Sequence, residues 1–390
     1  MTSAYIVDAL RTAGGRRKGR LAGWHPVDLA AAALNGIQDR HDFDPALVED
    51  VVMGCVSQAA QQSSNIARNA VLASRLPESV PATTVDRQCG SSQQALQFAA
   101  QAVASGTMDV VIAAGVESMT RVPMGIARTL PEANGFGNYR SPGLEARYPG
   151  VIFSQFTGAE LMATKYGLGR EALDDFAFLS HERAIAATRA GHFAREILPL
   201  EVDGGDGTTT LHSVDEGIRF EGSRNALADM KPIEEGGLLT AGSASQICDG
   251  ASAVLIANEA GLKALGAKPL ARIRTMTVVG HDPVIMLEAP IPATNRALQR
   301  AGLALDDIDL FEVNEAFASV PLAWLQALRA DPARVNIHGG AIALGHPLGA
   351  SGTKLMATLV WALHQHGKRH GLLTMCESGG MANATIIERV

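Results

Sequence analysis

Cysteines and aromatic residues are both scarce in this sequence. Aromatic residues make up 5% of its 390 residues, and it has four cysteines: Cys55, Cys89, Cys248 and Cys376. The two nearest cysteines, Cys55 and Cys89, are 34 residues apart, so the sequence has no CxxC zinc knuckle and no sign of a disulfide framework. Each cysteine is therefore expected to be either a buried structural thiol or a nucleophile.

Positive charge is also in short supply. Lysine and arginine total 33 against 40 aspartate and glutamate residues, a net charge of −7, which excludes a global basic field for nucleic acid or an anionic membrane. No apolar run approaches the ~18 residues of a membrane helix, and the first residues contain no cleavable apolar region. We expect a cytoplasmic protein without nucleic-acid or membrane partners, in which a local site holds any anionic ligand.

The hydrophobic residues, by contrast, make up 47% of the chain, enough for a large core in two or three domains. Short continuous apolar runs are typical of strands buried on both faces, and between them lie helical patterns such as the one from Ala95 to Val103, which stops at Gly106. Alternating strands and helices predict an α/β fold with mostly parallel sheets covered by helices. The predicted strands lie at 5–7, 51–53, 110–113, 254–257, 310–313 and 372–375.

Residues 119–245 differ in being rich in glycine, proline and arginine, and we interpret them as an insertion of loops and a few helices. Within it, residues 169–191 predict one long surface helix, whose mixed charges indicate a solvated face rather than a site. A basic cluster near the start is likewise expected to be solvated surface. Its members are Arg11, Arg16, Arg17, Lys18 and Arg20.

The segments that flank the insertion resemble each other. Residues 32–58 and 296–318 both read as a helix, a loop, an acidic turn and a strand that runs into a polar turn. A turn plus helix followed by an apolar strand then recurs, from residue 89 to 106 and from residue 351 to 367. The chain therefore has the pattern of two copies of one βα unit set with an insertion between them.

Cys89 lies in VDRQCGSSQQAL, between a strand-like segment and the start of a helix. At a helix N-terminus, the dipole and free N–H groups lower a thiol pKa and bind a developing oxyanion. The local pattern thus favours a nucleophile, with an inert buried thiol as the alternative.

Three other segments place polar side chains after strands or among glycines. NIHGGAIALGHPLGASGTK contains His338 and His346 in a glycine-rich loop, and the pattern alone does not choose between them. The GK[ST] ending of a P-loop is absent from it. Cys376 in TMCESGG and Asn314 in EVNEAF each follow an apolar strand, and Glu315 is expected either to hold its loop by hydrogen bonds or to take part in a site, with neither alternative favoured. The two remaining cysteines, Cys55 and Cys248, are interpreted as structural.

Six ordered segments over the whole length resemble the thiolases. The resemblance implies an α/β fold of two similar βα halves packed as αβαβα layers, with an inserted loop domain. It places the N-terminal half at 1–118, completed by about 246–268, the CoA-binding insertion at 119–245 and the C-terminal half at 269–390. The six segments are VDRQCGSSQQAL, GVESMTRVP, LTAGSASQICDGASA, VNEAFA, NIHGGAIALGHPLGASG and TMCESGG.

The resemblance also implies roles for individual residues. Cys89 would be the acylated nucleophile, His346 the base that activates it, and Cys376 a second acid/base. Asn314 would hold a water that forms one oxyanion hole with His346, and the backbone N–H groups of Cys89 and Ser378 would form the other. His338 would have no role.

Coenzyme A would be a substrate rather than a bound cofactor, and no metal is implied. Arg219 would lie near its adenine end, and Ala241 and Ser245 along its pantetheine. The implied reaction is CoA-dependent cleavage of a 3-ketoacyl-CoA to acetyl-CoA and a shortened acyl-CoA, and the reverse Claisen condensation, by an acyltransferase with an acyl-cysteine intermediate. The expected assembly is a homodimer or homotetramer.

The chain departs from the family pattern at three places, of which the first bears on the second oxyanion hole and the other two bear on the substrate. Ser378 stands in a tail that commonly reads C-x-G-G-G, Gln155 lies where acetoacetyl-specific members carry a His-Met-Gly segment, and Gln246 replaces a common glycine. The last two favour a degradative thiolase of broad acyl range. The alternative is an acetoacetyl-CoA-specific acetyl-CoA acetyltransferase.

Three further hypotheses have less support. A decarboxylating ketoacyl synthase would need a second histidine in place of Cys376, and a non-catalytic CoA-binding protein would have lost one of Cys89, His346 and Cys376. Cys89 and Cys376 could also form a redox-sensing pair.

Overall fold

The computed structural model describes residues 2–205 and 207–390 and is built around one large sheet. Its main strands follow the order β11-β12-β13-β10-β1-β9-β5-β3-β4. Each predicted apolar run lies within one of these strands, which confirms those predictions. The strands are β1 (Tyr5–Thr12), β3 (Asp50–Gly54), β4 (Ala82–Val85), β5 (Val110–Ser118), β9 (Cys248–Ala257), β10 (Ala271–Gly280), β11 (Leu310–Val313), β12 (His370–Glu377) and β13 (Met381–Arg389).

The sheet is mixed, and the prediction of mostly parallel strands was wrong. β3 pairs in parallel with β4 and β5, and β11 with β12. However, β9 runs antiparallel to β1 and β5, and β13 runs antiparallel to β10 and β12. A parallel neighbour needs a crossover connection, whereas β13 follows β12 through a tight turn at 378–380, so it runs back along its neighbour.

The internal repeat is confirmed by the strand order. The strands of the first half follow the order β4-β3-β5-β9-β1. The strands of the second half follow the order β11-β12-β13-β10, which matches β3-β5-β9-β1 of the first half strand by strand. The second half has a single bridge from Phe311 to Val335 where the first half has β4. The halves meet where β1 pairs antiparallel with β10, through Ile6 and Ala271.

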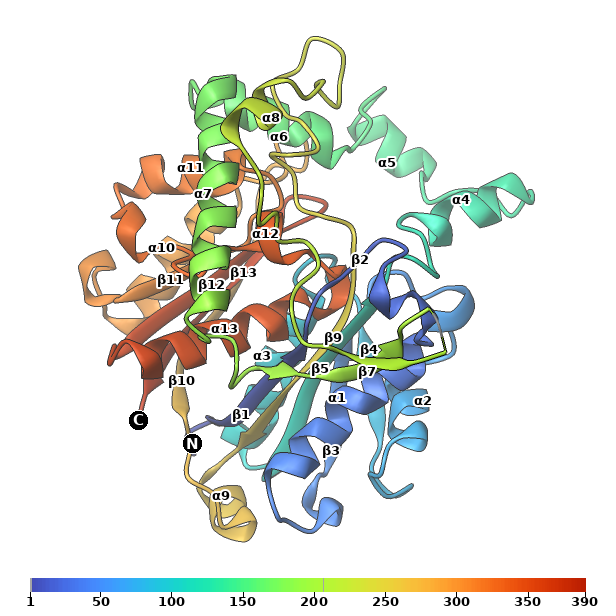
Figure 1. The fold of residues 1–390 in the computed structure, drawn as a ribbon, viewed down its shortest axis with the longest axis vertical. Coiled ribbons are helices and arrows are strands. Elements are labelled where there is room, and N and C mark those ends of the chain that lie inside the picture. The colour runs from blue at the N-terminus through green and yellow to red at the C-terminus, as the bar shows by residue number, and fades with distance from the viewer. Residues whose placement is uncertain (1, 206) are drawn as a thin grey trace.

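Helices divide the molecule into αβαβα layers (Figure 1). The helices α3 and α13 pack on each other and contact strands of both halves, so they form the central layer. α1 and α2 cover the outer face of the first half, and α10 and α11 cover that of the second. The helices are α1 (Pro26–Arg40), α2 (Ile66–Ala73), α3 (Ser91–Ser105), α9 (Glu259–Leu265), α10 (Pro290–Ala301), α11 (Ser319–Leu328), α12 (Ala341–Leu344) and α13 (Ser351–Gln365).

The segment between β5 and β9 contains short elements and one long helix. In Figure 1, α4 and α5 project away from the body, and neither has a buried residue. In the described part of the chain, none of the helices is long and apolar enough to cross a membrane. The elements are α4 (Ile126–Ala133), α5 (Pro142–Arg147), α6 (Gln155–Lys165), α7 (Arg170–Arg189), β6 (Ile197–Leu198), β7 (Leu200–Asp203), β8 (Thr209–His212) and α8 (Arg224–Ala228), with the short β2 (Gly15–Arg16) preceding α1.

The helix α7 confirms the predicted element, but its interpretation as a solvated face was wrong. Leu173, Ala177 and Ala184 are fully buried, and Ser180 and His181 are buried polar residues. Mixed charge on the exposed face hid this inward stripe, because the apolar residues on it are mostly small.

The basic cluster also needs a correction. Arg16, Arg17, Lys18 and Arg20 are exposed as predicted, but Arg11 is fully buried. Arg11 lies on β1, where alternate side chains point to opposite faces of the sheet, and its guanidinium pairs with two acids of the insertion.

Candidate active site

Cys89 lies in a tight turn at the N-terminus of α3. Gln88, before it, has a left-handed φ of 49°, and the N–H of Ser91 donates to the Gln88 carbonyl at 3.0 Å. A non-glycine residue held at positive φ is sparsely populated and concentrates at functional sites. Gly90 follows, and a Cβ there would lie 2.1 Å from Glu377 Oε1, so a larger residue would displace the Glu377 carboxyl group. The predicted position of Cys89 is thus confirmed.

The Cys89 thiol is protonated in the resting site. Its pKa is raised to about 12, chiefly by burial and then by the charge of Glu377 when that group is ionised, while a hydrogen bond with the Gln155 side chain opposes the rise. The expectation of a lowered thiol pKa was wrong, because burial of a side chain that is 3% exposed raises the pKa by more than the hydrogen bonds to the sulfur lower it. Cys89 therefore needs a base to become a nucleophile.

His346 is a buried neutral imidazole with one ring nitrogen committed. Its Nδ1 lies 2.5 Å from Ser351 Oγ, and Ser351 Oγ donates to the Pro347 carbonyl at 2.9 Å. Because the hydroxyl proton is used there, His346 Nδ1 carries the hydrogen and Nε2 is left as an acceptor. Burial and the charge of Lys354 lower the His346 pKa to about 3. Ser351, which sequence analysis did not identify, is thus the residue that fixes the tautomer.

Asn314 lies beside the free nitrogen of His346. Its Nδ2 is 3.4 Å from His346 Nε2, and its buried Oδ1 has no hydrogen-bond partner. An unpaired buried carbonyl oxygen is costly, so this atom is available to a water or a ligand. The structure therefore brings these two predicted site residues together.

The ends of α3 and α13 bring Cys89 and His346 to the same region. The N–H of Thr353 in α13 donates to Ser92 Oγ in α3 at 3.0 Å, and a Cβ on Gly352 would lie 2.1 Å from the Gln93 nitrogen. Cys89 directly precedes α3, and the loop of His346 directly precedes α13. Helices that start in contact place both residues at one end of the central layer.

Two buried carboxylates hold the loops of this region. Glu117 accepts hydrogen bonds from the N–H groups of Val56, Ser57 and Gly349 and from Gln62. Glu315 accepts from Ser180, Asn336 and the N–H of Ile342. The loop-holding interpretation of Glu315 is thereby confirmed.

Cys376 ends an apolar strand and faces Cys89. Burial raises its pKa well above the usual value, and the Cys89 charge, when present, raises it further. Ser378 and the glycines after it form the turn to β13, with Gly379 and Gly380 at φ of 85° and 74°. A Cβ on Gly380 would lie 2.6 Å from the Asp282 carbonyl oxygen, so this turn requires glycine.

Glu377 is a buried carboxyl group that sequence analysis did not identify as functional. Both of its oxygens lack a hydrogen-bond partner, and its residue is 0% exposed. Burial raises its pKa to about 8, opposed by the charge of Arg87. Glu377 is consequently a neutral acid at neutral pH, directly beside the Cys89 turn.

An apolar cluster surrounds Cys376. It includes Ala159 and Met162 of α6 together with Met286, Leu287 and Phe317. Phe156 packs edge-on against Phe317 at a ring distance of 5.6 Å. This side of the site thus offers apolar contacts to a ligand.

A cavity of about 850 Å³ lies between α7 and residues 218–230. Arg219 lines it, and the N–H of Arg219 donates to Nδ1 of the buried His181 at 3.2 Å. Gln246 connects the cavity region to the site, since it donates to the Gly217 carbonyl while its own carbonyl accepts from the His346 N–H. Ala241 and Ser245 do not line this cavity.

Two comparisons with families of known proteins cover nearly all of the chain. The family description "Thiolase, N-terminal domain" matches residues 4–260, and "Thiolase, C-terminal domain" matches residues 267–389. A steroid 3-ketoacyl-CoA thiolase of Mycobacterium tuberculosis is 54% identical, with 100% of this chain and 95% of that protein covered. A 3-ketoacyl-CoA thiolase of Pseudoalteromonas translucida is 43% identical, with both chains covered completely.

Solved structures agree with these matches. An acetyl-CoA acetyltransferase of Bacillus anthracis superposes with a TM-score of 0.91 at 32% identity, and human mitochondrial 3-ketoacyl-CoA thiolase superposes with a TM-score of 0.89 at 34% identity. Each covers 100% of this chain and 99% of the solved chain. With both family domains, the layered fold and the paired buried thiols in place, the chain belongs to the thiolase family.

Proposed function

We propose that this chain is a degradative 3-ketoacyl-CoA thiolase that cleaves a 3-ketoacyl-CoA with CoA to acetyl-CoA and a shortened acyl-CoA. As a thiolase it is an acyltransferase, and the reverse Claisen condensation uses the same groups. The observation that carries the proposal is the pair of buried thiols, Cys89 and Cys376, beside a neutral histidine with a free acceptor nitrogen.

Acylation begins with proton transfer from Cys89 to His346 Nε2. The thiolate attacks the 3-keto carbon, and the carbanion of acetyl-CoA leaves as the bond between C2 and C3 breaks. Ser351 keeps Nε2 free to accept this proton, and Gln155 supports the sulfur charge through its hydrogen bond. In the resting site both groups are neutral, which avoids the cost of two buried charges before the reaction starts.

Cys376 serves as the second acid/base. Its protonated thiol gives a proton to the acetyl-CoA enolate and then takes the proton of incoming CoA, whose thiolate attacks the acyl-Cys89 thioester. The bond between the acyl carbon and the Cys89 sulfur then breaks, and the Cys89 thiolate takes back the proton held by His346. The raised pKa of Cys376 keeps it protonated before the first of these steps. In the condensation direction Cys376 removes the α-proton of acetyl-CoA.

Two oxyanion holes accompany these steps. Asn314, with a water on its amide, and His346 form one, supported by the 3.4 Å approach of the two side chains. The backbone N–H groups of Cys89 and Ser378 form the other, and backbone donors at such positions are typically worth 10²–10³ in rate, or about 3 kcal/mol.

CoA enters along the insertion. Arg219 in the cavity wall is proposed to lie near the adenine end, and Ala241 and Ser245 to contact the pantetheine where it runs towards Cys89. The insertion at 119–245 would thus be the CoA-binding unit between the halves at 1–118 and 269–390. We also propose that the protein acts in the cytoplasm as a dimer or tetramer, with the exposed apolar Leu130 and Phe136 at contacts between copies.

The acyl range is proposed to be broad. Gln155 contacts the Cys89 thiol, and the side chains packed around Cys376 are apolar, which suits contact with a long or branched acyl chain. The relative that is 54% identical is named a steroid 3-ketoacyl-CoA thiolase. The alternative, an acetoacetyl-CoA-specific acetyltransferase, has less support, because the match of that name is only 32% identical.

The test is CoA-dependent cleavage of a 3-ketoacyl-CoA series from acetoacetyl-CoA to long and branched chains. We expect kcat/KM to rise from acetoacetyl-CoA to the longer members. A preference for acetoacetyl-CoA would favour the alternative, and no cleavage of any member by protein that still binds CoA would overturn the thiolase activity itself.

Glu377 is expected to set the alkaline limit of this activity. Its pKa of about 8 means that it gains a negative charge beside Cys89 as the pH rises through 8, which disfavours the Cys89 thiolate. We expect kcat/KM to fall above about pH 8 and the fall to be absent in Glu377→Gln, measured as pH profiles from pH 6 to 10. An alkaline limb that is unchanged in Glu377→Gln would refute this assignment.

The same shift affects stability. The unfolded chain loses the Glu377 proton near pH 4.5, whereas the folded protein holds it to about pH 8, so its contribution to stability falls as the pH rises between these values. We expect denaturant midpoints of Glu377→Gln to lack this part of the decline.

A further inference from the structure

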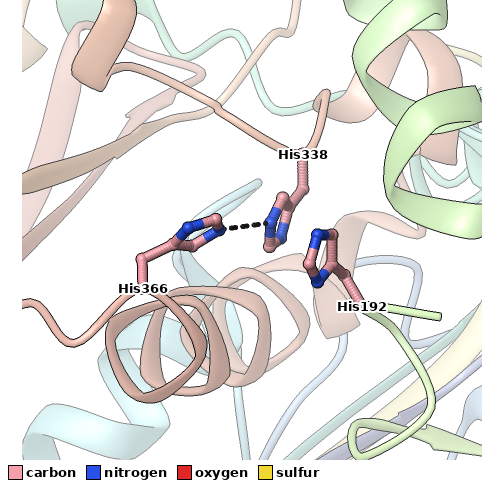
Figure 2. Close-up of side chains that lie close together, drawn as sticks. All are labelled: His192, His338 and His366. Atoms are coloured by element: carbon pink, nitrogen blue, oxygen red, sulfur yellow. Dashed lines mark hydrogen bonds between the residues drawn. The ribbon is translucent and has the colours of Figure 1, made fainter. Parts of the chain in front are cut away.

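Three histidines from separate elements meet at one place outside the thiol site (Figure 2). His192 follows α7, His338 lies in the loop before α12, and His366 follows α13. One ring nitrogen from each lies within 4.8 Å of the others. In the part of the chain that the structure describes, these residues form the one group of three or more His, Cys, Asp or Glu side chains with this spacing.

The rings are arranged closely enough to share one ion. His338 Nε2 and His366 Nε2 are 3.2 Å apart, and the His192 and His338 rings stack at 4.8 Å with 11° between their planes. Metal–nitrogen bonds of ~2.0–2.1 Å in a tetrahedral site place two ligand nitrogens about 3.3 Å apart. His338 and His366 already have this spacing, and the His192 nitrogen, which lies within 4.8 Å of theirs, has to come closer by rotation of its ring for all three to bind one ion.

Two of the three imidazoles have a pKa below the usual value for histidine. His338 is 4% exposed, and burial together with the other two rings lowers its pKa to about 3. Burial, His192 and Lys368 lower the pKa of His366. A metal binds the lone pair of a neutral imidazole, so the hydrogen between His338 Nε2 and His366 Nε2 moves to an Nδ1 atom when both Nε2 atoms bind the ion.

The backbone around the cluster is already fixed. The N–H of Gly339 donates to the Asn336 carbonyl at 2.9 Å, and a Cβ on Gly339 would lie 2.5 Å from the Ser180 carbonyl oxygen, so the His338 loop packs tightly on α7. The Gln365 side chain at the end of α13 donates to the His192 carbonyl at 2.5 Å. Little ordering is left for an ion to impose, which favours affinity.

We propose that His192, His338 and His366 bind one divalent transition-metal ion, with Zn²⁺ as the first candidate and water as the fourth ligand. Three imidazoles without a carboxylate suit Zn²⁺, Co²⁺, Ni²⁺ or Cu²⁺ and not Mg²⁺ or Ca²⁺, which prefer oxygen ligands. Because His366 is exposed, the fourth position and the entry path lie on its side of the cluster.

The ion would act as a cross-link. It would join the end of α7, the end of α13 and the loop that leads through Gly340 and α12 to His346. Gly340 is tied to α7 as well, because its N–H donates to Ser180 Oγ. Binding to the folded state alone raises stability by mass action. The site takes no part in the thiol chemistry, and the proposal stands independently of the proposed function.

Cobalt titration followed by zinc competition tests this site on the full chain after treatment with a chelator. We expect one Co²⁺ per chain, with visible absorption bands of nitrogen and oxygen coordination and no thiolate-to-cobalt charge-transfer band. Zn²⁺ should displace the Co²⁺ and raise Tm. A thiolate band would place the metal on a cysteine and overturn the proposal, as would the absence of uptake at millimolar Co²⁺.

Variants locate the ion. His366→Gln changes an exposed side chain and His338→Asn a buried one, and each should weaken metal affinity by about 100-fold, the share of one ligand in a histidine site. His41→Gln is the matched control, since His41 pairs with Asp8 away from the cluster, and its affinity should equal that of the unmodified protein. Unchanged affinity in both cluster variants would overturn the proposal, and His366→Gln decides the outcome if His338→Asn fails to fold.

Discussion

Cys89→Ala is expected to abolish both acyl-enzyme formation and turnover. Incubation of the unmodified protein with acetyl-CoA should add one acetyl group per chain, detected by intact mass, and the variant should add none. Removal of a covalent nucleophile typically costs about 10⁴ to 10⁶ in kcat. The effect is this large because His346 and Cys376 transfer protons in this mechanism, and Cys89 alone forms the bond to the acyl group.

Cys248→Ala is the matched control for this experiment. Cys248 is a buried thiol with a pKa raised to about 12, like Cys89, but its sulfur contacts the Asp249 carbonyl and lies by Gly345 instead of at a helix start. The Cys248→Ala variant should therefore be acetylated to the same extent as the unmodified protein. An acetyl group that persists in Cys89→Ala would move the nucleophile to Cys376 or Cys55.

The strands and their repeat were largely predictable from the sequence. Buried strands such as β5 and β12 are short continuous apolar runs, and such runs are typical of strands that are covered on both faces. Strand direction was not predictable in the same way. β9 and β13 read like any other apolar run, and only their pairing shows that they run antiparallel to their neighbours.

The predicted site residues share a local signal that the missed ones lack. Cys89, His346 and Cys376 each stand beside glycines at the end of a strand or the start of a helix, so a single segment reveals them. Ser351 is the first residue of an ordinary helix, and Glu377 is of a residue type that is usually found on the protein surface. Their roles depend on contacts with His346 and with the Cys89 turn, which only the folded chain makes.

The histidine cluster could not be predicted from the sequence either, because its three members come together only in the folded chain. His192, His338 and His366 are separated by 146 and 28 residues, and none stands in a spacing typical of metal ligands. Each is ordinary in its own segment. The three residues come together through contacts among the end of α7, the end of α13 and the His338 loop. The expectation that no metal is involved could therefore not be tested from the sequence alone.

Arg11→Met is expected to be among the most destabilising single substitutions in the chain. Arg11 is 0% exposed, and its guanidinium donates to Glu196 Oε1 at 2.6 Å and to Asp215 Oδ1 at 2.7 Å. Removing one member of a buried ion network leaves uncompensated charge and typically costs about 3–5 kcal/mol. Here two carboxylates lose their partner, so we expect at least that loss in chemical denaturation. Arg16→Met, which changes an exposed side chain, should change the free energy of unfolding by less than about 1 kcal/mol.

The pH dependence of Arg11→Met separates charge from packing. Arg11 lowers the pKa of Asp215 and opposes the burial that raises the pKa of Glu196. Without it, both folded-state pKa values rise, so folding takes up protons and the variant should recover stability as the pH falls from 8 to 5. A loss of stability that stays constant over this pH range would mean that Arg11→Met destabilises the protein through lost packing of the side chain. Recovery would show that the charge of Arg11 holds Glu196 and Asp215 of the insertion against β1. The sequence does not reveal this ion pairing, because Arg11 lies in a strand of mostly apolar residues.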